Sequence, residues 1–172
     1  GVFPVDCNHR LYGLTMRLLA LDYGTKRIGV AVSDELAFGA YPLTTIHRSR
    51  SLTHDLQEIL RIAQKEEVGV IVVGLPLNAD GTQGPSAKNA ASFAASLGKR
   101  TTLPIHLHDE FLTTAEAEEA MISMDVSRKK RRETIDKAAA ALILDSYLRA
   151  QRERASIESM SEAPTDASKL TE

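Results

Sequence analysis

Residues 17–34 read RLLALDYGTKRIGVAVSD, and this stretch decides the fold. Two apolar segments, 17–24 and 27–34, are separated by a short polar turn and are therefore expected to pair as an antiparallel hairpin. Asp22 stands at the end of the first segment, behind four aliphatic residues. A carboxylate at the border of a core loses water at a high cost unless a cation or a donor pairs with it. The alternative is a turn-forming aspartate that hydrogen-bonds the loop backbone.

Downstream of the hairpin, apolar runs and amphipathic segments alternate. Periodicity and capping signals predict strands at 40–48, 68–76 and 104–111, and helices at 51–67, 84–99, 113–124 and 128–153. Strands that return through helices are parallel neighbours. The predicted fold class is therefore α/β, with a mixed five-stranded sheet and helices on both faces.

The bulk properties suit one globular domain. The chain has 172 residues, of which 43% are apolar and 26% charged. It contains no bilayer-length apolar run and no signal-peptide pattern, and its single cysteine, Cys7, excludes an internal disulfide, so a cytoplasmic location is expected. The predicted division is an irregular N-terminal extension (1–15), a domain (16–152) and a disordered polar tail (153–172). The net charge of -2 leaves the partner open.

Two further carboxylates occupy unusual positions. Glu110 ends the last predicted strand, at a sheet rim where ligand sites form. The alternatives there are a solvated turn pair with Asp109, or a metal cluster with His106 and His108, which share its strand face.

Asp136 lies inside the long helix, on one stripe with Ala139, Ala140 and Ile143. Small residues on that stripe let the helix approach its neighbour closely, so a lone carboxylate there needs a cation or a donor. The alternative is an aspartate at the edge of the stripe, paired with Lys137 or Arg132.

Carboxylates on two strands and one helix can meet at one rim of the sheet. Hard oxygen ligands suit Mg²⁺ or Mn²⁺, and a pair of such ions can activate water and stabilise the leaving oxygen in phosphodiester cleavage. We therefore predict that Asp22, Glu110 and Asp136 are catalytic residues and hold Mg²⁺ or Mn²⁺, with two ions expected.

Five consecutive basic residues, 128–132, begin the long helix a short distance before Asp136. Positive charge is unfavourable at a helix N-terminus, which favours phosphate binding over a merely solvated helix start. The turn after Asp22 and the loop LNADGTQG (77–84) offer further contacts. The predicted nucleic-acid-binding residues are Lys26, Arg27, Asn78, Lys129, Lys130, Arg131 and Arg132.

Four motifs in order resemble the YqgF family, also called RuvX. They are LLALDYGTKRIGVAVSD (18–34), VVGLPLNADGT (72–82), DEFLTTAEAE (109–118) and IDKAAAALILDSYL (135–148), and the resemblance covers residues 16–150. It implies a ribonuclease H-like fold and a Mg²⁺- or Mn²⁺-dependent nuclease that cleaves branched DNA or matures the 5′ end of pre-16S rRNA. The acidic residues of the family fall on Asp22, Glu110 and Asp136. The family usually has arginine where Phe111 stands here.

Two other functions compete with a nuclease. An ATPase or sugar kinase of the actin type has a similar phosphate-binding turn, but it needs two such domains and this chain supplies one. A non-catalytic nucleic-acid-binding or ribosome-associated module would keep the fold, but it would not require all three carboxylates. Cutting of DNA junctions would require a two-fold homodimer, because two strands must be nicked symmetrically; no membrane partner is expected.

Overall fold

The computed structural model describes residues 16–110 and 128–161. The strands are β1 (Arg17–Tyr23), β2 (Arg27–Ser33), β3 (Ala40–His47), β4 (Val68–Pro76) and β5 (Ile105–Glu110). The helices are α1 (Leu52–Lys65), α2 (Pro85–Gly98) and α4 (Arg128–Ser161). The predicted helix at 113–124 lies outside the described residues.

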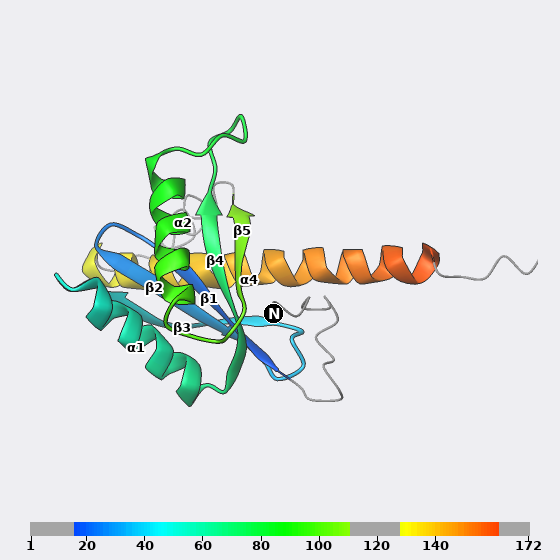
Figure 1. The fold of residues 1–172 in the computed structure, drawn as a ribbon, viewed down its shortest axis with the longest axis horizontal. Helices are drawn as coiled ribbons and strands as arrows, with labels where there is room; N and C mark the ends of the chain where they lie inside the picture. The colour runs from blue at the N-terminus through cyan, green and yellow to red at the C-terminus, as the bar shows by residue number, and fades with distance from the viewer. Residues whose placement is uncertain (1–15, 111–127, 162–172) are drawn as a thin grey trace, which may run out of the picture.

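One mixed sheet organises the molecule, with the strand order β3-β2-β1-β4-β5. The first three strands pair antiparallel, and β4 and β5 run parallel to β1. The helical crossovers α1 and α2 connect the parallel strands, as the alternation of the sequence predicted (Figure 1). The predicted mixed five-stranded sheet is confirmed.

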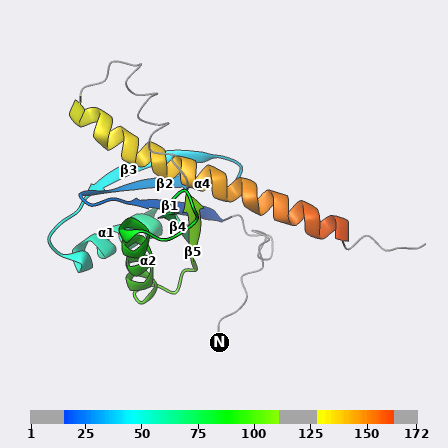
Figure 2. The same ribbon diagram turned by 90° about the horizontal axis from the view of Figure 1, so that it is seen from above.

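The two faces of the sheet are covered by different helices. Figure 2 shows α1 and α2 below the sheet and α4 above it. Side chains of β1 alternate between the two faces. Leu19 and Leu21 pack in the core between the sheet and helices α1 and α2, while Leu18 and Ala20 pack against α4. By the same alternation, the next residue on the α4 face of β1 is Asp22.

Helix α4 forms the second core with the predicted stripe. Ala139, Ala140 and Ile143 are fully buried, and Ile143 and Ala140 contact the α4 face of the sheet. The helix ends at Ser161, later than the predicted domain end at 152, and residues 152–161 are exposed. Intrinsic propensity explains this extension, since this segment has no glycine or proline and contains Arg, Glu, Ala and Met, which favour helix without any packing. Within the described ranges, no helix is long and apolar enough to cross a bilayer.

Candidate active site

Asp22 lies half-buried at the carboxyl end of β1. Its backbone pairs with Gly29 of β2 in the antiparallel register. No hydrogen bond or ion pair to its carboxylate is present among the described residues. A carboxylate in this setting has lost part of its hydration without gaining a donor, which is the costly arrangement that the sequence indicated.

Gly29 brings α4 to Asp22. A Cβ atom at Gly29 would lie 1.9 Å from the carbonyl oxygen of Asp136 and 2.3 Å from its carbonyl carbon. The backbone of α4 therefore rests directly on β2, and only glycine leaves room for it. The contact sets Asp136 of α4 beside the strand position that pairs with Asp22. Glycine inside a strand is a signal of close backbone approach, and it could have identified this contact from the sequence.

The two aspartates interact electrostatically. Burial, and next the negative charge of Asp136, raise the pKa of Asp22 from 3.8 to about 6. The Nε of Arg27 donates a hydrogen bond to Oδ2 of Asp136. Arg27 is thus the partner of Asp136 among the described side chains, and its contact with a phosphate stays a prediction.

This donor set fits a divalent cation. Two neighbouring carboxylates offer hard oxygen ligands, and a cation between them would remove the repulsion that raises the pKa of Asp22. Among the described side chains, no group of three His, Cys, Asp or Glu residues could hold a metal ion. The backbone of Glu110 pairs with Pro76 at the end of β5, but its side chain lies outside the described set, so its role as third ligand stays a prediction.

The turn between β1 and β2 is held in place by Arg48. Its Nη1 donates to the carbonyl oxygens of Gly24 and Thr25, at 3.1 and 3.0 Å. Its guanidinium lies 4.5 Å from the ring centroid of Tyr23, which stacks on Phe93. Arg48 thus fixes the loop that follows Asp22, a positioning role that nothing in its local sequence signals.

The other predicted nucleic-acid contacts divide into two groups. Lys26 at the hairpin turn and Lys130 on the first turns of α4 are exposed. Asn78 is also exposed, although its Nδ2 donates to Oγ1 of Thr82 within the β4–α2 loop. The side chains of Lys129, Arg131 and Arg132 lie outside the described set.

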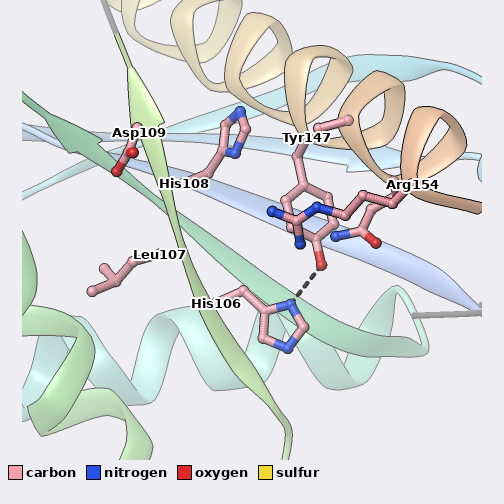
Figure 3. Close-up of a pocket in the computed structure, with 8 residues that line it drawn as sticks. His106, Leu107, His108, Asp109, Tyr147 and Arg154 are labelled. Atoms are coloured by element: carbon pink, nitrogen blue, oxygen red, sulfur yellow. Dashed lines mark hydrogen bonds between the residues drawn. The ribbon is translucent and has the colours of Figure 1, made fainter. Parts of the chain in front are cut away.

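His106 and His108 contact α4. His106 Nδ1 shares a hydrogen bond with the Tyr147 hydroxyl (Figure 3). His108 Nε2 lies 2.9 Å from the Ser146 hydroxyl oxygen. Burial lowers the pKa of both imidazoles. These contacts account for both rings without a metal, so the rival cluster of two histidines and Glu110 gains no support from the described residues.

Arg27→Gln should destabilise the metal-free protein by about 2 kcal/mol. The Arg27–Asp136 pair is half-buried, so the free-energy cost of losing it lies between the costs for exposed and for buried ion pairs. Asp136 would then face Asp22 without the positive charge of Arg27. Urea unfolding in EDTA measures the change. Arg61→Gln is the matched control, because the Arg61–Glu58 pair is exposed and should contribute little. Equal effects of the two substitutions would contradict a special role for Arg27.

Comparisons with known proteins identify the family of this chain. A family model described as "RuvX: Holliday junction resolvase" matches residues 16–150. A protein of Halalkalibacterium halodurans, named "Putative pre-16S rRNA nuclease", is 48% identical over 138 residues, which are 80% of this chain and 99% of that protein. A protein of Carboxydothermus hydrogenoformans with the same name is 49% identical over 133 residues, which are 77% of this chain and 96% of that protein.

A solved structure is also similar. It is RuvC of Thermus thermophilus in complex with a Holliday junction substrate. The sequences are 13% identical, the match covers 80% of this chain and 96% of that chain, and the TM-score is 0.49. The matched family residues span β1 through most of α4 and include both aspartates of the site. The chain belongs to the RuvX family.

Proposed function

We propose that this protein is a Mg²⁺- or Mn²⁺-dependent endonuclease that hydrolyses phosphodiester bonds. The observation that carries the proposal is the placement of Asp22 beside Asp136, with the pKa of Asp22 raised to about 6. A structural role would leave two repelling carboxylates without a benefit, whereas binding of a divalent cation relieves their repulsion. The names of the relatives support a nuclease.

Asp22, Asp136 and Glu110 are the residues proposed to hold the metal ions, two in number. Such ions lower the pKa of a bound water and stabilise the leaving oxygen during phosphodiester hydrolysis. The protein contributes positioning: Gly29 sets the distance between strand and helix, and Arg27 orients the Asp136 carboxylate. Arg48 holds the turn that presents the exposed Lys26 beside the site.

Nucleic acid is the proposed substrate, bound through its backbone. The basic run at 128–132 opens α4, two turns ahead of Asp136, and would supply phosphate contacts that carry no sequence information. The names of the relatives favour the 5′ end of pre-16S rRNA, processed in the cytoplasm, and the family description favours a branched DNA. The second substrate would require a two-fold dimer.

A cleavage panel tests the proposal. It contains a four-way DNA junction, linear duplex DNA, single-stranded DNA and a structured RNA that spans the 5′ end of mature 16S rRNA, each with Mg²⁺, Mn²⁺ or EDTA. Asp136→Asn should reduce metal-dependent cleavage by at least about 100-fold. Asp145→Asn is the matched control on the same helix, since Asp145 pairs with Arg149 and should leave cleavage unchanged. Binding of these substrates without any metal-dependent cutting would refute the nuclease and favour a non-catalytic module.

A further inference from the structure

A polar cavity lies between β5 and α4, apart from the two aspartates. Its volume is about 340 Å³, near the lower limit for small-ligand sites and suited to a group the size of one nucleotide. One wall is formed by residues 106–109 of β5, which include His106, His108 and the acidic Asp109. The other is formed by Tyr147, Ala150, Gln151 and Arg154 on α4. Tyr147, Gln151 and Arg154 follow the i, i+4, i+7 spacing, so they form one stripe of the helix. Figure 3 shows Tyr147 and Arg154 of this stripe on the side that faces β5.

Gln151 is the unusual residue of this cavity. Its side chain is 9% exposed, and its Oε1 is buried without a hydrogen-bond partner among the described residues. A buried carbonyl oxygen with no donor is costly, and natural proteins rarely keep one without a ligand or water to satisfy it. The cavity therefore has a built-in acceptor that requires an N–H or O–H group from outside.

Arg154 adds a cation at the exposed side of the same cavity. Its side chain forms no ion pair with any described residue, and its positive charge reaches His108. Gln151 and Arg154 are three residues apart, which places their Cβ atoms roughly 5–6 Å from each other on one helix face. A ligand with a hydroxyl group close to a phosphate matches this pair, because the hydroxyl can donate to the amide oxygen while the phosphate meets the guanidinium.

We infer that this cavity binds one sugar–phosphate unit of a nucleic-acid strand, with a sugar hydroxyl donating to Oε1 of Gln151 and the phosphate on Arg154. The inference rests on the proposed function for the identity of the strand. Gln151 follows Asp136 by 15 residues on α4, or about 22 Å, so the unit would lie several nucleotides from the aspartates. The 2′-hydroxyl of ribose satisfies Gln151, whereas deoxyribose within a strand has no such donor.

The test measures binding by the full-length chain in EDTA, where no cleavage contributes. Fluorescently labelled oligouridine and the matching oligodeoxyuridine are the probes. Arg154→Gln should weaken both by about fivefold and reduce the salt dependence of binding by about one ion. Gln151→Leu should weaken oligouridine by about fivefold and leave oligodeoxyuridine unchanged. Arg152→Gln removes the same charge from a residue that does not line the cavity and should change neither probe.

Three results would overturn the site. They are equal effects of Arg154→Gln and Arg152→Gln, an unchanged preference between the probes in Gln151→Leu, and binding of free adenosine 5′-monophosphate as tightly as the oligonucleotide. Circular dichroism of each variant verifies folding. Because the binding assay excludes metal, it separates the two proposals. If the protein cleaves the panel substrates but the cavity variants bind as the wild type does, only the cavity site is refuted. If the cavity variants bind more weakly but the protein cleaves no panel substrate, only the nuclease is refuted.

Discussion

Asp22→Asn is expected to stabilise the metal-free protein at neutral pH while it abolishes cleavage. Burial and then Asp136 raise the pKa of Asp22 from 3.8 to about 6, so the folded state disfavours the charged carboxylate. Below pH 4 the carboxyl group is protonated in both the folded and unfolded states and carries no penalty. As the pH rises from about 4 to 6, the unfolded chain releases its proton first, and the wild type loses up to about 3 kcal/mol relative to the variant.

Urea unfolding across this pH range, in EDTA, measures the effect. Asp34→Asn is a control of opposite sign. Burial acts to raise the pKa of Asp34, but hydrogen bonds from the backbone N–H groups of Phe38, Gly39 and Leu36 outweigh it and lower this pKa. The variant should therefore lose stability at neutral pH. Added Mn²⁺ should raise the stability of the wild type and have little effect on Asp22→Asn. A variant that cuts at the wild-type rate would remove Asp22 from the catalytic residues.

Gly29→Ala should disrupt much of the contact between α4 and the sheet. The added Cβ would meet the Asp136 carbonyl group at 1.9–2.3 Å, and these are backbone atoms of a helix that cannot rotate away. The helix would have to lift from β2 and carry Asp136 away from Asp22. We expect a loss of about 3 kcal/mol or more in the free energy of unfolding, at the upper end of the range for overpacking, together with loss of metal-dependent cleavage.

Gly69→Ala is the matched control in another strand of the same sheet. A Cβ there would meet Cε and Sδ of Met16 at 2.5 and 2.6 Å, but this flexible side chain can move aside. Its expected cost is within about 1 kcal/mol, with cleavage retained. Thermal unfolding and the cleavage panel compare the two variants. Similar losses for both would show that the contact at Gly29 is not what places Asp136.

The sequence predicted the features that periodicity controls. Apolar runs in β1 and β4 and the stripe of Ala139, Ala140 and Ile143 in α4 specify which faces are buried, and the structure confirms them. The meeting of Asp22 and Asp136 was also predicted, because a strand end and a small-residue stripe both point to one rim of the sheet. In the structure the negative charge of Asp136 acts on Asp22, and the role of both residues as metal ligands stays a prediction.

Other features depend on tertiary contacts that no local pattern encodes. The pairing of Arg27 with Asp136 is one of them, because the two residues are 109 positions apart in the chain. Nothing in the local sequence signals the burial of Gln151, because β5, which lines the same cavity, lies far away in the sequence. The sequence predicts an end of the long helix at residue 153, whereas α4 continues to Ser161, because helix propensity sustains the exposed turns without apolar packing.

The contact of α4 with Gly29 also has a mechanical consequence. From Asp136 the helix extends for about 37 Å to Ser161, and its outer part passes beyond the sheet (Figure 1). The helix is held at Gly29 and by buried residues from Ile135 to Gln151, so displacements of its exposed part grow with distance from this segment. Asp136 lies within the held segment. Thermal bending of the free end, where Ile157 and Met160 are exposed, therefore leaves the carboxylate almost stationary beside Asp22.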